Sequence, residues 1–112
     1  MKLVTAIIQP QQLPAVKKAL FEAQIKHMSC TNVLGTAPEG AEVLIFRGVT
    51  QKVSLAQKVR IELALRDEMK DRAVQAIIHG AEARGGYGAI MVTELNEYIN
   101  VRSGEHGEGA LK

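Results

Sequence analysis

Tryptophan is absent from the chain and the other aromatic side chains are rare, since only 4% of its 112 residues are Phe or Tyr. Because 46% of the residues are nevertheless hydrophobic, a chain of this single-domain size can bury a core, and that core must be aliphatic. The only cysteine, Cys30, excludes an internal disulfide and fits a reducing cytoplasm. We expect it to be a small buried side chain on a strand, with a reactive thiol as the alternative.

An excess of charge of one sign is also lacking. The 14 basic and 12 acidic residues give a net charge of +2, and no basic run is interleaved with aromatics, so nucleic-acid binding is not indicated. The first apolar stretch ends at Gln9-Pro10, which is too short for a signal peptide or membrane span. His27, His79 and His106 lie on separate segments without metal-ligand spacing, and no Ser/His/Asp or Cys/His set can be nominated. We therefore expect a protein that is not an enzyme and has no metal site.

Hydrophobic patterning predicts two similar halves. Apolar runs and alternations predict strands at residues 3–8, 28–34, 59–63, 89–95 and, shorter, 98–101. Apolar residues at helical spacing predict two helices, one carrying Leu13, Val16, Leu20 and Phe21, the other capped by Asp67 and carrying Met69, Ala73, Ile77 and Ala81. The order βαβ, long connection, βαβ predicts a ferredoxin-like α+β fold in one domain, residues 1–112.

The connection at about residues 36–57 is too long for an ordinary hairpin. A loop of this length in a compact domain is usually functional or disordered. Within it, Val43, Leu44, Ile45 and Phe46 form an apolar quartet that does not suit a solvated loop. We expect the quartet to be extended structure or a partner contact, and the alternative is a strand that continues outward from the sheet.

A glycine-rich run, Arg-Gly-Gly-Tyr-Gly-Ala at residues 84–89, lies between the second helix and a strand. Glycines let the backbone approach a ligand closely and turn N–H groups toward an anion such as a phosphate. The run leads from helix to strand, however, whereas P-loops and dinucleotide fingerprints lead from strand to helix. A plain turn is the alternative, in which Tyr87 is an exposed turn residue and not a ligand contact.

Short segments in a fixed order point to a family. They are Met1-Lys2 leading to Ala6-Ile7-Ile8 and Pro10, Val33-x-Gly35, Arg47-Gly48, Lys58-Val59-Arg60-Ile61-Glu62, Gly86-Tyr87-Gly88, and Val101-Arg102-Ser103-Gly104-Glu105. In this order and without large gaps, they resemble the PII signal-transduction family over essentially the whole chain. The resemblance implies a cytoplasmic homotrimer, active in nitrogen regulation, that binds ATP, ADP or AMP in three clefts between subunits. Its T-loop (about 36–57) would insert into a target, often an ammonium channel or an enzyme.

The resemblance also implies roles for individual residues, including those of the B-loop (about 82–89) and the C-terminal loop (about 102–112). The implied nucleotide-binding residues are Ile7, Met28, Ser29, Gly35, Thr36, Ala37, Pro38, Glu62, Leu63, Ala64, Arg84, Gly86, Tyr87, Gly88, Ala89 and Arg102. Glu39 and Lys58 are implied for an effector or Mg²⁺. Val43, Phe46, Arg47 and Gln51 are implied as partner contacts. Besides the cations, the amides of Gly86 to Ala89 are expected to face the phosphates.

The sequence departs from the family pattern where phosphates would bind. Ala89 stands in place of a Lys, and Asn100 in place of one of two arginines. Each lost charged hydrogen bond costs about 1.5–3 kcal/mol, or roughly 10- to 100-fold in affinity. Because a triphosphate loses most, we expect ADP or AMP to compete with ATP better than in a typical member. Gln51 replaces the Tyr that is modified in the family, which excludes uridylylation at that position.

A second departure concerns the effector. Pro38-Glu39 stands where the family has Arg-Gln, and this Gln helps to hold Mg²⁺ and 2-oxoglutarate beside ATP. A carboxylate can still bind a cation, but it repels a dianionic keto acid. Lys58, which contacts that keto acid in the family, can pair with Glu39 instead. We therefore expect no 2-oxoglutarate sensing by the usual route.

Three further interpretations stay open. Lys58, Arg60 and Glu62 share one side of an alternating strand, which is either a solvated face of mixed charge or the border of the intersubunit cleft. The whole chain is alternatively a ferredoxin-like trimer that senses a metal ion or another small anion. A small enzyme using Glu62 or His79 as a base is a third reading, for which the sequence gives little reason.

Overall fold

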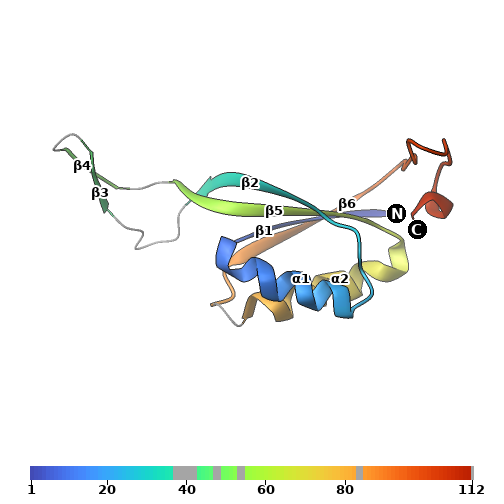
Figure 1. Ribbon diagram of the computed structural model, residues 1–112, viewed down its shortest axis with the longest axis horizontal. Helices are drawn as coiled ribbons and strands as arrows, with labels where there is room; N and C mark the ends of the chain where they lie inside the picture. Colours follow the sequence, from blue (N-terminus) through green and yellow to red (C-terminus); the bar gives the residue numbers. More distant parts are fainter. Residues whose placement is uncertain (37–42, 47–48, 53–54, 83–84, 112) are drawn as a thin grey trace.

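The computed structural model describes residues 1–36, 55–82 and 85–111, and the backbone alone at 43–46 and 49–52. One layer is an antiparallel sheet in the strand order β2-β5-β1-β6, and two helices cover one of its faces (Figure 1). The strands are β1 (Lys2–Ile8), β2 (Ser29–Thr36), β5 (Leu55–Leu65) and β6 (Gly88–Glu94); the helices are α1 (Leu13–Glu22) and α2 (Lys70–Glu82). This confirms the predicted ferredoxin-like α+β fold.

The core lies between the sheet and the helices and is aliphatic, as the composition predicts. Every second residue of β1 and β5 faces the helices, so that Val4, Ala6, Ile8, Val59, Ile61 and Leu63 are buried. The stripe predicted on α2 is confirmed, with Ala73, Ile77 and Ala81 buried and Met69 partly buried. The prediction for Phe21 is wrong: its side chain is 64% exposed, because it lies about 100° around α1 from the buried Leu20.

The helices approach each other closely at Gly80. A Cβ atom at this position would lie 2.6 Å from the Cα of Val16 and 2.9 Å from the carbonyl oxygen of Ala15. Only glycine therefore permits the observed distance between the backbones of α1 and α2.

The long connection contains a hairpin of its own. β3 (Val43–Phe46) pairs antiparallel with β4 (Val49–Lys52), in a two-stranded ladder beyond the ends of β2 and β5 (Figure 1). The prediction of extended structure for the quartet is confirmed for the backbone. The main sheet also reaches further than predicted, since Thr36 of β2 pairs with Leu55 of β5.

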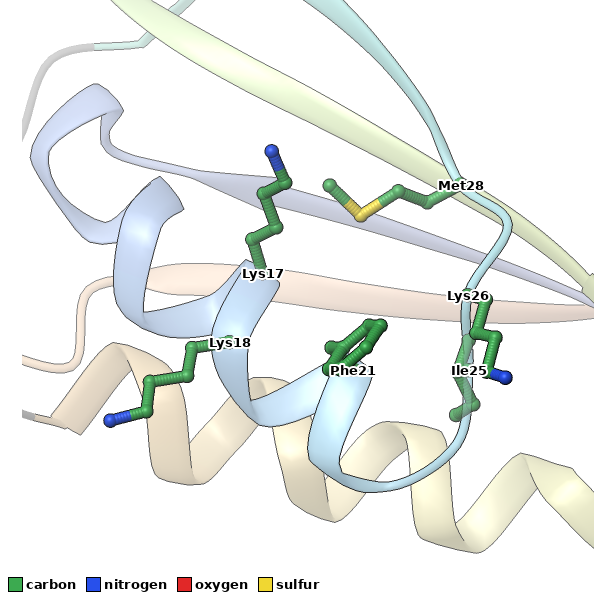
Figure 2. Close-up of a pocket in the computed structure, with 6 residues that line it drawn as sticks. All are labelled: Lys17, Lys18, Phe21, Ile25, Lys26 and Met28. Carbon is green, nitrogen blue, oxygen red and sulfur yellow. The ribbon is translucent and has the colours of Figure 1, made fainter.

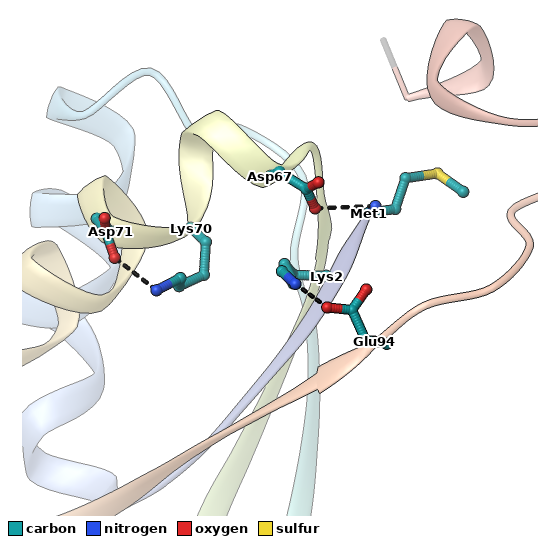
Figure 3. A network of polar contacts seen from close by, with 6 residues as sticks. All are labelled: Met1, Lys2, Asp67, Lys70, Asp71 and Glu94. Atoms are coloured by element: carbon teal, nitrogen blue, oxygen red, sulfur yellow. Dashed lines mark hydrogen bonds and ion pairs between the residues drawn. The ribbon is translucent and has the colours of Figure 1, made fainter.

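The N-terminus is tied to the start of α2. Asp67 begins a 3₁₀ turn (Asp67–Met69) before the helix, and its carboxylate lies 2.9 Å from the Met1 ammonium group (Figure 3). The prediction that Asp67 caps the helix is therefore wrong, because its side chain bonds the chain terminus instead. The hydrogen bond from that ammonium group lowers the pKa of Asp67. Lys2 pairs with Glu94 beside it, and Lys70 with Asp71 at 2.6 Å (Figure 3).

The chain after β6 forms a compact turn. Of the strand predicted at 98–101, the structure has one isolated β-bridge, between Ile99 and His106. A 3₁₀ turn (Glu108–Ala110) follows, and Ala110 is buried. The segment thus packs against the domain near the end of β5.

Cys30 lies on a strand, as predicted, but the prediction that it is buried is wrong. The residue is exposed in β2. β2 is an edge strand, and most of its side chains are exposed on both faces of the sheet. A position at an edge does not gain the burial that the same hydrophobic residue has in a central strand.

Candidate functional site

A groove of about 850 Å³ lies where β5 ends and β2 begins. Ser29 pairs with Glu62 across the two strands, and Ala64 follows on the same face of β5. Met28, directly before β2, also lines the groove. The fold thus brings together Met28, Ser29, Glu62 and Ala64, four of the residues predicted to bind a nucleotide.

Leu63 does not share this groove through its side chain. It is 1% exposed and packs in the core on the helix side of the sheet, because its neighbours Glu62 and Ala64 take the open side. Any contact from Leu63 to a ligand is limited to its backbone.

The open face of β5 carries charge. The guanidinium Nε of Arg60 lies 3.7 Å from a carboxylate oxygen of Glu62, and both side chains are partly exposed. Such an exposed pair contributes at most about 1 kcal/mol to stability. The pair therefore leaves Arg60 and Glu62 accessible to a ligand or a second chain.

The glycine-rich run closes the C-terminal end of α2. The N–H of Gly86 donates to the carbonyl of Ala81 at 3.1 Å, and that of Gly85 donates to Glu82 at 3.3 Å. Both glycines have positive φ angles, +73° and +97°, which satisfy the last carbonyls of a helix. The expectation that the Gly86 amide faces a phosphate is wrong, because this donor is used within the chain.

Gly88 has a separate reason to be glycine. It begins β6 opposite Ile8, and a Cβ atom there would lie 2.6 Å from the carbonyl oxygen of Ile7. Between the capping glycines and this contact stands Tyr87, which is 60% exposed. Among the described residues, the amide of Tyr87 donates to no backbone carbonyl.

A second hollow, of about 330 Å³, lies beside the run. It brings Gly86, Tyr87, Gly88 and Ala89 together with apolar side chains of α2, including Ile78. Ala89 itself pairs with Ile7, another predicted nucleotide contact. The predicted residues of the glycine-rich run thus form a second group.

The two groups lie at opposite ends of the sheet. The groove begins near Leu3, which pairs with Ala64, whereas the run reaches Ile8, which pairs with Gly88. Ala64 and Gly88 are thus five positions of β1 apart, about 17 Å at 3.3 Å per residue. Glu62 and Ala89, which pair with Thr5 and Ile7, are two positions apart. One chain therefore does not gather all predicted nucleotide contacts into one cavity.

Lys58 lies at the same end as the glycine-rich run. It pairs with Val33, and its side chain crosses Gly35, where a Cβ atom would lie 2.9 Å from Lys58 Cδ. Gly35 thus leaves room for a half-buried Lys58 beside Thr36, at the base of the long connection.

Several predicted residues cannot be placed in this way. Ala37, Pro38, Glu39, Arg47 and Arg84 lie outside the described residues, so the predicted pairing of Glu39 with Lys58 stays a prediction. Val43, Phe46 and Gln51 are described by their backbone in β3 and β4.

Arg102 lies on an exposed turn that Asn100 organises. The Asn100 side-chain oxygen accepts hydrogen bonds from the N–H groups of Arg102 and Ser103, at 3.0 and 3.1 Å. Asn100 also lines the groove beside Glu62 and Ala64. The residue in place of the expected arginine therefore shapes the backbone that carries Arg102.

The chain is similar to proteins of one family over nearly its whole length. The family model for nitrogen regulatory protein P-II matches residues 1–105. This chain belongs to the P-II family. It is 40% identical to nitrogen regulatory protein P-II of Rhodobacter capsulatus over 112 residues, covering 99% of this chain and 100% of the relative. It is 37% identical to the P-II protein of Azospirillum brasilense, with the same coverage. It is 32% identical to GlnK1 of Methanosarcina mazei, covering 99% of this chain and 97% of the relative.

The described residues also bear on metal binding and on membrane insertion. They contain no group of three or more His, Cys, Asp or Glu side chains arranged to hold a metal ion. None of their helices is long and apolar enough to cross a membrane.

Two features of this P-II protein were not predicted from its sequence. Gln12 is completely buried, and nothing in the Gln-Pro-Gln-Gln stretch distinguishes it from Gln9 or Gln11. A hollow of about 340 Å³ lies between α1 and the segment before β2, where Phe21 stands between Lys17 and Lys26 (Figure 2). The only sequence signal for this hollow is the position of Phe21 at the edge of the apolar stripe of α1.

Proposed function

We propose that this P-II protein is a non-enzymatic cytoplasmic regulator that binds adenine nucleotides in clefts shared between the subunits of a homotrimer. The observation that carries the proposal is the division of the expected contacts into two groups at opposite ends of the sheet. A cyclic trimer places one group of each chain against the other group of the next chain. Three equivalent sites result.

Each group offers the chemistry that one part of a nucleotide needs. The groove combines apolar surface from Met28 and Ala64 with the polar groups of Ser29 and Glu62, which suits a purine base and a ribose. The glycine-rich run offers the amide of Tyr87 to a phosphate, and the exposed Arg102 supplies a cation. Together the two groups offer contacts to the base, the ribose and the phosphates.

The hairpin of β3 and β4 is the proposed contact to a target transporter or enzyme. It stands beyond the sheet, and its strand β3 holds the apolar quartet (Figure 1). The strands that lead to it, β2 and β5, carry Gly35, Thr36 and Lys58 at its base. A ligand at this end of the sheet would favour particular shapes of the connection.

Calorimetric titration with ATP, ADP and AMP tests the proposal, each with and without Mg²⁺ and 2-oxoglutarate. We expect micromolar binding of at least one adenine nucleotide and no added affinity from 2-oxoglutarate. Light scattering should give the mass of a trimer. Absence of binding by all three nucleotides would contradict the proposal.

A further inference from the structure

Gln12 is the only fully buried polar side chain in the described part of the chain. It ends the 3₁₀ turn (Pro10–Gln12) between β1 and α1. Its Oε1 accepts from the N–H of Gln9 at 2.7 Å, and its Nε2 donates to the carbonyl of Ala81 at 3.4 Å. Because an unpaired buried amide is costly, both contacts matter. Gln12 therefore connects the start of α1 to the end of α2.

The carbonyl of Ala81 also holds the glycine-rich run. The N–H of Gly86 donates to this same oxygen at 3.1 Å. On the other side, Gly88 pairs with Ile8, the residue directly before Gln9. The run is thus anchored at one end to the carbonyl that Gln12 contacts, and at the other end to the residue next to Gln9, whose N–H donates to Gln12.

We propose that Gln12 is a positioning residue for nucleotide binding. Its amide fixes the Ala81 carbonyl and, through Gly86, the direction in which Tyr87 and Gly88 present their backbone to a phosphate. Gln12 does not touch the ligand, because its side chain is 0% exposed. The inference rests on the proposed function, which assigns phosphate contact to this run.

Two variants remove the contacts. Gln12→Met has a similar length and Gln12→Leu is shorter and branched, and neither keeps the hydrogen bonds to Gln9 and Ala81. The nucleotide among ATP, ADP and AMP that binds the wild type most tightly is titrated against each variant. We expect both to bind about tenfold more weakly, which corresponds to one lost hydrogen bond.

Amide hydrogen exchange gives a readout that needs no nucleotide. Exchange at Gly86 should become about tenfold faster in both variants, because the Ala81 carbonyl that accepts from Gly86 and Gln12 is less restrained. Ile61→Val is the matched control, since it removes a methylene group from the core of β5 without contacting the run. It should lose stability yet keep its affinity within about twofold and its Gly86 exchange unchanged.

The outcomes distinguish the two proposals. Unchanged affinity and unchanged Gly86 exchange in the Gln12 variants overturn the positioning role, as does an equal loss of affinity in Ile61→Val. If Gln12→Met does not fold, Gln12→Leu still tests the loss of the hydrogen bond to Ala81. If the wild type binds no nucleotide, the proposed function fails, whereas the exchange rates still decide whether Gln12 anchors the run.

Discussion

At the scale of single residues, Gly80 shows how one absent methyl group sets the distance between two helices. Gly80→Ala should destabilise the protein by about 1–3 kcal/mol, because the new Cβ would overlap the backbone of Val16. Denaturant unfolding measures the change. Gln75→Ala, at an exposed position of α2, is the control and should change stability by less than about 0.5 kcal/mol. Equal stability of the wild type and Gly80→Ala would contradict the close approach.

Residues also show where prediction from sequence reaches its limit. Periodicity identified Ala73 and Ile77 as core, because burial of an amphipathic face repeats along the chain. It could not foresee that Asp67 bonds the Met1 ammonium group or that Gln12 is buried, because these contacts join segments far apart in the sequence. The resemblance to a family predicted the site residues, but it did not show that they form two groups. That division follows from the pairing register of the strands.

The ion pair of Asp67 predicts a dependence of stability on pH. Its pKa is lowered from the ordinary value of 3.8, mainly by the hydrogen bond from the N-terminal ammonium group. A lowered pKa in the folded state gives a contribution to stability that is present above the unfolded pKa and is lost as pH falls through the folded pKa. Asp67→Asn should therefore show a shallower loss of stability below pH 3.8 than the wild type.

Unfolding curves recorded at neutral and at acidic pH measure this difference. Acetylation of the N-terminal amine should reproduce the effect, because it removes the partner charge. Identical acid dependence of wild type and Asp67→Asn would show that the pair is not formed in solution.

A substitution at Ala89 tests whether an ammonium group at this position would strengthen binding of a phosphate. Ala89→Lys restores an ammonium group at the end of the glycine-rich run, and we expect about a tenfold gain in ATP affinity with a smaller gain for AMP. Thr93→Lys places the same charge on the same face of β6, away from the run, and should have little effect. Titration with ATP and AMP measures the affinities of both variants. Equal gains in affinity from Ala89→Lys and Thr93→Lys would contradict a local contact between residue 89 and the phosphates.

At the scale of elements, the β3–β4 hairpin is separable from the sheet. β3 and β4 pair only with each other and with no strand of the main sheet. The pairing of β2 with β5 begins at Thr36 and Leu55 and does not involve the hairpin. Replacing residues 37–54 by a short Gly/Ser linker should leave the thermal midpoint within a few degrees, since closing such a loop costs only about 1 kcal/mol. Circular dichroism measures the midpoint. Collapse of the fold would show that the hairpin supports the core.

At the scale of the whole molecule, the two groups predict complementation between chains. Ala64→Glu impairs the groove and Ala89→Glu the end of the glycine-rich run, so each homotrimer should bind poorly. In a cyclic trimer that contains both variants, one interface joins an intact groove to an intact run. An equal mixture refolded together should regain about one quarter of the wild-type sites. Titration with the nucleotide counts the regained sites. If the mixture regains no sites, the nucleotide site lies within one chain.

The length of β5 has a consequence for energetics. This single strand runs from Leu55, where the hairpin connection ends, to Leu65, which lines the groove. In the proposed function, a protein bound to the hairpin and a nucleotide bound at the sheet would thus both contact one continuous strand. By thermodynamic reciprocity, whatever factor the nucleotide imposes on affinity for the protein, the protein imposes on affinity for the nucleotide. The captured regulator would then hold its nucleotide with a different affinity from the free one, so occupancy would report on the partner as much as on the nucleotide pool.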